Sequence, residues 1–172
     1  MLISDYGRIV TGKTPTTKNK DYWDGTIPFV TPGDIQGTKH IFSTARNVSK
    51  SGMNSVRGAI LPKGAICVSC IGNIGYVGMT IKECISNQQI NSIIVNEKHN
   101  PDFVYYLMKF LWPFFKNYEG QSTTLSILNK GQFSKIEVEN KSREEEDRIA
   151  AILSVIDAKI ESNNEINKNL AA

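Results

Sequence analysis

The sequence lacks the features that mark a secreted or membrane-spanning protein. Its most apolar stretch, residues 103–115, is interrupted by Lys109 and Pro113 and is shorter than the roughly 20 apolar residues that cross a bilayer. Residues 1–7 have neither a basic start nor an apolar run, so no secretory signal is predicted. The three cysteines are an odd number, which favours reduced thiols. We expect a cytoplasmic protein that makes no membrane contact.

The sequence also lacks the signatures of several enzyme classes. It contains no GxxxxGK[ST] phosphate loop and no Asn/Asp-Pro-Pro-Tyr/Phe run of the kind found in amino-methyltransferases. His40 and His99 have no evident nucleophile beside them in the sequence. These absences favour binding over catalysis, and we expect neither catalytic residues nor a cofactor held by this chain.

Two patterns resemble parts of metal sites, and each has a simpler interpretation. Cys67 and Cys70 have the spacing of a zinc-binding pair, but no second pair follows, and positions i and i+3 of a strand point to opposite faces. We favour buried thiols. Glu139 and Lys141 resemble half of a nuclease metal site, which also needs a well-placed upstream acid. We predict no metal site, and a small nuclease is the third-ranked function.

The composition is that of one globular domain with an appendage. The 172 residues are 40% hydrophobic and 22% charged, which is sufficient for a sizeable core. Residues 1–135 hold 15 Lys and Arg against 8 Asp and Glu, a balance of +7, whereas residues 136–172 hold 5 against 9, a balance of −4. A basic body indicates a polyanionic partner and an acidic tail a protein partner. Alternatively, the uneven distribution of charge arises by chance, and the acidic tail is a helix exposed to solvent.

Residues 1–140 are predicted to be strand-rich, with frequent turns. Strands are expected at residues 27–30, 65–71, 76–81 and 91–95, with residues 72–75 as a four-residue hairpin loop. A helix is expected to begin at Asn100 and Pro101 and to end near residues 118–120. The apolar face of this helix would pack on the sheet through Phe103, Leu107, Phe110, Leu111 and Phe114. Residues 133–138 are predicted to form a last strand.

Residues 141–172 are predicted to form a long helix that needs a partner. Ser142 and Glu145 have the spacing of a capping box. Apolar and amide positions then alternate at spacings of 4 and 3, and Ile152 and Ile166 widen this coiled-coil seam. The seam favours pairing with a second helix, and the alternative is a helix folded back on its own domain. The seam positions are Ile149, Leu153, Ile156, Ile160, Asn163, Asn167 and Leu170.

Several basic and polar segments are candidates for contacts with DNA. Residues 12–20 are basic and rich in hydroxyls, and residues 121–124 offer neutral donors and acceptors, which suit phosphates and base edges. Residues 12–20 could instead be a solvated surface loop, and residues 121–124 a simple loop at a helix end. For Lys39, His40 and Arg46 the alternative is scattered surface charge. The amides of residues 86–89 are assigned an internal role instead. The candidates are Lys13, Thr14, Thr16, Thr17, Lys18, Lys20, Lys39, His40, Arg46, Asn73, Gln121, Ser122 and Thr123.

Taken in order, these segments resemble a known family. Residues 12–15 and 22–35 resemble the start of a target recognition domain from a type I restriction-modification specificity subunit. Residues 72–75 and 86–90 resemble the middle of that domain, and residues 120–123 with 133–138 resemble its end. Residues 149–160 resemble the start of the helical spacer that comes after the domain.

The resemblance implies a fold, a role and a set of partners. The fold would be α+β, with a β-rich target recognition domain and packed helices in residues 1–140 and a long coiled-coil spacer helix in residues 141–172. The chain would be a non-catalytic, DNA-binding specificity subunit that reads one half of a split site in double-stranded DNA. It would position modification (methyltransferase) and restriction subunits, and S-adenosylmethionine, magnesium and ATP would belong to those partners alone.

The chain departs from the family pattern in two ways. Family members usually carry two recognition domains and two spacers, whereas this chain has one of each. Two identical copies joined antiparallel along the helix would form a homodimer that reads an inverted repeat; a truncated product or a piece of a longer subunit is the alternative. The usual Glu-Gln before the spacer is also missing, because Glu146 follows Glu145. The second-ranked function is a regulatory protein whose helix competes for full-length specificity or modification subunits.

Overall fold

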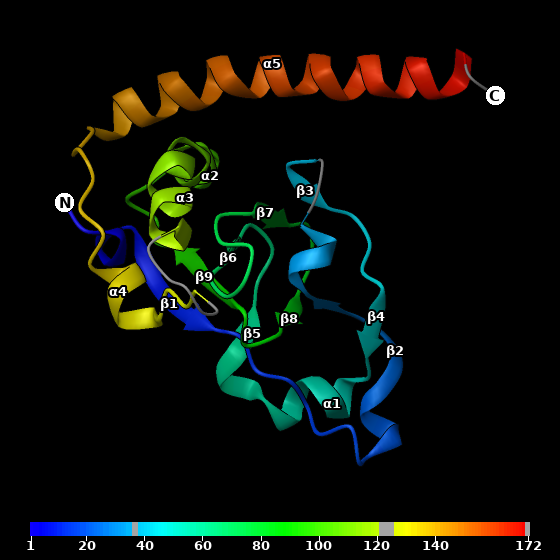
Figure 1. Ribbon diagram of the computed structural model, residues 1–172. Helices are drawn as coiled ribbons and strands as arrows, with labels where there is room; N and C mark the ends of the chain where they lie inside the picture. The colour runs from blue at the N-terminus through cyan, green and yellow to red at the C-terminus, as the bar shows by residue number, and fades with distance from the viewer. Residues whose placement is uncertain (36–37, 121–125, 171–172) are drawn as a thin grey trace.

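The computed structural model describes residues 1–35, 38–120 and 126–170, which form two mixed sheets with packed helices and a long C-terminal helix (Figure 1). The α+β expectation is confirmed. The five-stranded sheet has the order β1 (Gly7–Thr11), β9 (Ile90–Val95), β6 (Ile66–Ser69), β7 (Val77–Thr80) and β3 (His40–Ile41). The four-stranded sheet has the order β4 (Arg46–Val48), β2 (Trp23–Val30), β8 (Cys84–Ser86) and β5 (Ile60–Leu61).

Short helical turns connect these strands. Strand β3 pairs parallel to β7, and β2 pairs parallel to β8, so neither sheet is purely antiparallel. The residues between β4 and β5 form a helix whose N-cap, Ser49, accepts a hydrogen bond from the backbone N–H of Gly52. The short elements are η1 (Ile3–Asp5), η2 (Lys20–Tyr22), η3 (Pro32–Asp34), α1 (Lys50–Ser55) and η4 (Arg57–Ala59).

Strands β6 and β7 form the predicted hairpin, but its loop is longer than expected. The antiparallel pairs Ile66↔Met79 and Val68↔Val77 confirm the pairing. Because β6 ends at Ser69 and β7 begins at Val77, residues 70–76 make the connection rather than residues 72–75 alone. The chain turns at Gly72 and Gly75, where φ is 75° and 95°, values that glycine adopts without strain.

Gly75→Ala is expected to lower the free energy of unfolding by about 1–3 kcal/mol. A Cβ at this position would lie 2.9 Å from the Cβ of Phe115, which is fully buried, and the φ of 95° disfavours a side chain independently. Gly58→Ala is the matched control, because a Cβ there meets nothing within 4 Å. Urea unfolding of both variants measures the difference, and equal midpoints would contradict this account of the loop.

The predicted helix of residues 100–120 is divided in two by Pro113. Asn100 caps α2 (Pro101–Phe110) as expected, accepting hydrogen bonds from the backbone N–H groups of residues 102 and 103. A second helix, α3 (Trp112–Gly120), comes next, because Pro113 has no N–H to donate to the carbonyl four residues earlier. The buried face of α2 includes Val104 and Met108, and Phe110 points away from both of them and is 80% exposed. Phe114, on α3, is 42% exposed. The prediction that both pack on the sheet was wrong.

Residues 133–138 do not form the predicted strand. Asn129 and Gln132 make a capping box that starts a helix, α4 (Lys130–Ser134), and Phe133 is buried within it. The segment after this helix has only an isolated bridge between Leu2 and Glu137. It is fixed instead by two backbone hydrogen bonds to the start of the chain, from Ile3 N to Ile136 O (3.0 Å) and from Val138 N to Met1 O (2.9 Å).

Two apolar clusters lie on opposite faces of the five-stranded sheet. The larger packs Val68, Ile93 and other strand residues against α2, α3 and α4, and the smaller lies between the two sheets. Cys70 belongs to the first cluster and Cys67 to the second. Burial raises the pKa of Cys67 to about 11 and that of Cys70 to about 12. The prediction of buried thiols is confirmed.

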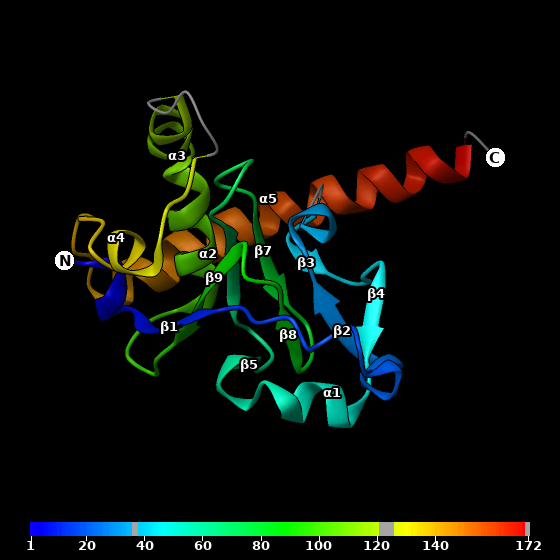
Figure 2. The same ribbon diagram turned by 60° about the horizontal axis from the view of Figure 1, so that its bottom comes forward.

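The predicted C-terminal helix, α5 (Arg143–Leu170), crosses one side of the molecule and extends beyond it (Figures 1 and 2). The capping box is present: Ser142 N donates to the Glu145 carboxylate (2.8 Å), and Glu145 N donates to Ser142 Oγ (3.3 Å). Helices α2 and α5 pack together, while β2, β4 and α1 lie on the side of the domain away from α5. In the part of the chain that the structure describes, no helix has the length and apolar character needed to cross a membrane.

Candidate nucleic-acid interface

The basic segment of residues 12–20 connects β1 to β2 and is held at two points. Thr14 Oγ1 donates to Gln88 Oε1 (2.7 Å), and the carbonyl of Thr16 accepts from the indole N–H of Trp23 (3.2 Å). Lys13, Lys18 and Lys20 are exposed, and none of them takes part in the ion pairs found among the described residues. Three free ammonium groups are therefore carried on an anchored loop.

Residues 86–89, which hold Thr14 through Gln88, are joined by backbone hydrogen bonds to two further segments. Cys70 N donates to Gln89 O (2.7 Å), and Gly72 N donates to Ser126 O (3.2 Å). Residues 12–20, 86–89, 70–75 and 126–128 therefore lie next to one another in that order, and we call these four segments the polar rim. Asn73 is exposed in the rim. The segment that contains Gln121, Ser122 and Thr123 lies outside the described residues, so those three candidates cannot be placed.

A buried amide, Asn91, connects two parts of this arrangement, and the sequence analysis missed it. Its side chain is 3% exposed; it accepts a hydrogen bond from Thr11 Oγ1 (2.7 Å) and donates to Leu128 O (3.2 Å). One residue thus holds the root of the basic segment against the last segment of the rim. Its position at the start of a predicted strand, directly after Ile90, was the available signal, because a buried amide must find partners.

The three remaining basic candidates lie in different environments. Arg46 is exposed on β4, with its guanidinium carbon 3.7 Å from the centroid of the Trp23 ring. His40 is half-buried on β3, beside Phe42. Lys39 is only 6% exposed, and its ammonium lies 2.7 Å from the Asp102 carboxylate. The expectation that Lys39 contacts DNA is corrected, because its charge is committed to α2.

Lys39 belongs to a buried polar cluster between β3, α2 and α5. Its ammonium donates to Tyr106 Oη (3.3 Å) and Ser154 Oγ (3.4 Å), and Tyr106 Oη donates to Asp157 (2.8 Å). Burial lowers the pKa of Lys39, but the hydrogen bonds to Asp102 and Tyr106 outweigh this and leave the pKa above its usual value. The charged lysine therefore helps to fix α5 on the domain.

The first turns of α5 are fixed by a buried carboxylate. Glu146 is fully buried; it lies 2.7 Å from His99 Nδ1 and accepts a hydrogen bond from Asn100 N (2.8 Å). His99 in turn lies against the ring of Tyr6. Ala150, one turn later, is also buried. The alternative of a helix folded on its own domain therefore applies to the first half of α5.

The second half of α5 leaves apolar side chains exposed. Of the predicted seam, Ile149 and Leu153 are half-buried, whereas Ile156 and Ile160 are each 51% exposed. Asn163 and Asn167 are exposed, and the side chain of Leu170 lies outside the described residues. Ile152 is exposed on the same side as Ile156, and Val155 and Ile166 are exposed on the flank beside it. The outer half of α5 therefore presents an apolar stripe that the domain does not cover.

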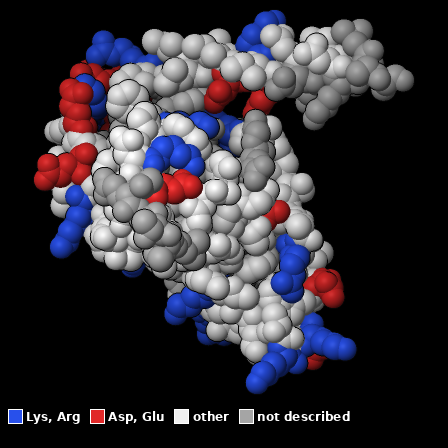
Figure 3. Space-filling view, in the orientation of Figure 1, with Lys and Arg blue, Asp and Glu red and all other residues white. Residues whose placement is uncertain are grey.

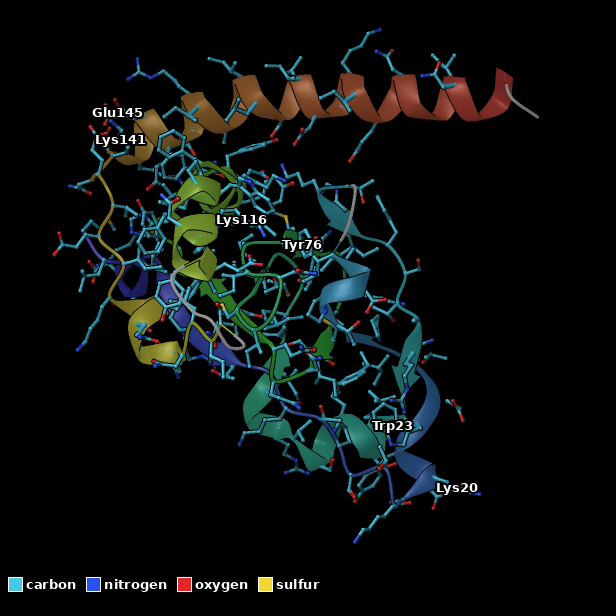
Figure 4. The ribbon with its side chains drawn as sticks, in the orientation of Figure 1. Lys20, Trp23, Tyr76, Lys116, Lys141 and Glu145 are labelled. Atoms are coloured by element: carbon cyan, nitrogen blue, oxygen red, sulfur yellow. The ribbon has the colours of Figure 1, made fainter. Side chains whose placement is uncertain are left out.

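The charge distribution separates the two ends of the molecule. Away from α5, residues 12–34 and 44–58 carry six Lys and Arg against three Asp, and blue side chains project from the lower part of the molecule in Figure 3. Figure 4 places Lys20 and Trp23 at that end, away from Lys141 and Glu145 at the root of α5. The described residues contain no group of three or more His, Cys, Asp or Glu that could hold a metal. The arrangement suits the binding of an anionic surface.

Comparison with known proteins agrees with this arrangement. The family described as the type I restriction modification DNA specificity domain matches residues 1–172. The chain belongs to this family. Membership confirms the resemblance and the expectation of a specificity chain, which is non-catalytic and carries no cofactor of its own.

Two curated specificity subunits are similar to this family member. The type I restriction enzyme HindI specificity subunit of Haemophilus influenzae is 37% identical over 144 residues, covering 83% of this chain and 31% of its own. The MjaIX specificity subunit of Methanocaldococcus jannaschii is 32% identical over 172 residues, covering 98% of this chain and 40% of its own. The specificity chain thus spans less than half the length of these relatives.

A solved structure shares the fold of this specificity chain. The specificity subunit of a type I system from M. genitalium aligns with a TM-score of 0.70 and 18% identity, over 99% of this chain and 42% of that one. The fold therefore accounts for somewhat under half of the larger subunit, as the sequence comparisons also show.

Proposed function

We propose that the chain reads one half of a split DNA site and that two copies, joined antiparallel along α5, form the working specificity unit. The observation that carries this proposal is the separation of the two surfaces. The free lysines of the polar rim lie at the end away from α5, and the exposed apolar stripe lies on α5 itself. One end can therefore bind DNA while the other binds protein.

The length of the relatives supports the pairing. This chain covers 31% and 40% of the two curated specificity subunits, so each has room for a second unit of the same size. In a two-fold pair, the second copy would supply that unit and direct it to the other half of an inverted repeat. Modification and restriction subunits would then bind along the paired helices.

Lys13→Ala combined with Lys18→Ala tests the DNA contact. The double variant is expected to bind duplex DNA about tenfold more weakly at low salt, with the slope of log K against log salt reduced by about 1.8, because each phosphate contact contributes about 0.9. Fluorescence anisotropy across a salt series measures both quantities. Lys98→Ala with Lys135→Ala removes two exposed charges outside the rim as the control. Equal slopes for the two double variants would count against the rim.

A competitor of full-length specificity or modification subunits remains the second candidate function. The exposed apolar stripe of α5 is equally compatible with a competitor, because such a protein also needs an unpaired helix. It does not need three free lysines on an anchored loop. The salt series therefore separates the two functions: a competitor would lose nothing when Lys13 and Lys18 are replaced.

A further inference from the structure

Arg46 differs from the exposed lysines of the polar rim in being held in a fixed plane. It lies on β4, the three-residue edge strand of the four-stranded sheet, opposite Phe29 of β2. Its guanidinium carbon is 3.7 Å from the centroid of the Trp23 ring. At this distance the guanidinium stacks on the indole, which restricts the side chain while leaving its N–H edge available.

The ring below Arg46 is itself immobilised. Trp23 is 9% exposed and packs edge-on against Phe29, with ring centroids 5.2 Å apart. Its indole N–H donates to the carbonyl of Thr16, in the middle of the basic segment. Arg46, Trp23 and the lysine-bearing loop therefore form one unit, so phosphates that bind the lysines would set the position of Arg46 relative to the duplex.

The exposed edge of Arg46 is not occupied by an acid. Among the described residues, Arg46 forms no ion pair, and the carboxylate of nearby Asp34 accepts from Ala45 N and from Thr31 instead. The guanidinium of Arg46 is planar and can donate two parallel N–H hydrogen bonds to two acceptors that lie side by side. On the major-groove edge of a base pair, guanine presents that pair of acceptors in N7 and O6.

We propose that Arg46 reads a guanine in the major groove of the half-site, a role that rests on the proposed function in DNA recognition. The lysines of the rim bind phosphates without regard to sequence, and Arg46 supplies discrimination at one base pair. Arg46 lies on β4, the edge strand of the four-stranded sheet, so this edge would face the major groove.

The test is a selection of binding sites from a randomised duplex library by the full chain, its Arg46→Ala variant and its Lys20→Ala variant. The wild type is expected to require guanine at one position that Arg46→Ala accepts as any base, with preference at that position reduced about tenfold to a hundredfold. Lys20→Ala, which removes an exposed charge from the same end of the molecule, is expected to weaken all sequences evenly and to keep the preference.

A modified base locates the contact on the guanine. Replacing the selected guanine by 7-deazaguanine, which lacks the N7 acceptor, is expected to weaken wild-type binding to the level of Arg46→Ala and to leave the variant unchanged. If Arg46→Ala keeps the wild-type preference, or weakens all sequences evenly as Lys20→Ala does, the assignment is overturned and the proposed function stands. A wild-type chain that selects no site at all would instead overturn the proposed function.

Discussion

Glu146→Ala is expected to lower the free energy of unfolding by about 3 kcal/mol. The carboxylate is fully buried at the root of α5, where it bonds to His99 Nδ1 and Asn100 N. Alanine would leave the Asn100 N–H without its partner and would detach the first turn of α5 from α2. Urea unfolding, followed by circular dichroism, measures the loss.

Two further variants make the Glu146 measurement specific. Glu144→Ala removes an exposed carboxylate from the same first turn and is expected to cost only about 0.5 kcal/mol, from the helix dipole. Glu146→Gln keeps an acceptor for Asn100 N and should recover part of the loss. A Glu146→Ala variant no less stable than Glu144→Ala would show that the buried contact does not fix α5.

Ile156→Asp combined with Ile160→Asp is expected to convert the proposed dimer to a folded monomer and to weaken binding to an inverted-repeat site by about a hundredfold or more, because the DNA-binding end of a second copy is no longer tethered to the same duplex. Both side chains are half-exposed on the outer half of α5, where charge would oppose helix pairing. Leu153 is left unchanged because it is half-buried against the domain. Sedimentation and DNA titration measure the two effects.

The matched control for that variant places the same two charges on the opposite face of the helix. Ala151→Asp with Ala158→Asp alters exposed positions that point away from Ile156 and Ile160, so it should leave both the proposed dimer and the affinity for DNA intact. A wild-type chain that sediments as a monomer at every concentration would overturn the proposed pairing, and so would an Ile156/Ile160 variant that remains dimeric.

Sequence reasoning succeeds here where the deciding signals are local. The long helix and its cap are predicted by Ser142, Glu145 and the recurrence of apolar residues after them, all within one segment. The β6–β7 hairpin is predicted similarly by two apolar runs around Gly72 and Gly75. In each case the residues that determine the element are close neighbours in the chain, so propensity and spacing are sufficient.

Errors arise where a distant segment decides the outcome. Residues 133–138 are rich in strand-forming residues, but Asn129 caps a helix, and backbone bonds to Met1 and Ile3 fix the residues after that helix. Lys39 has no mark in the sequence that separates it from a surface lysine, because its burial depends on α2 and α5. The polar rim was visible only as separate loops, since its assembly depends on Asn91, whose partners lie 80 and 37 residues away.

The contact of residues 1–3 with residues 136–138 has a consequence for how the chain folds as it is synthesised. Strand β1 leaves the ribosome early, but its partner β9 emerges about 80 residues later, and the backbone acceptor for Ile3 is later still. During translation β1 is therefore exposed without its partner strand, and this is the stage at which sheets with non-local strand pairs are most prone to aggregate. Truncations that end before residue 138 should accumulate in inclusion bodies, whereas loss of the outer turns of α5 should not impair solubility.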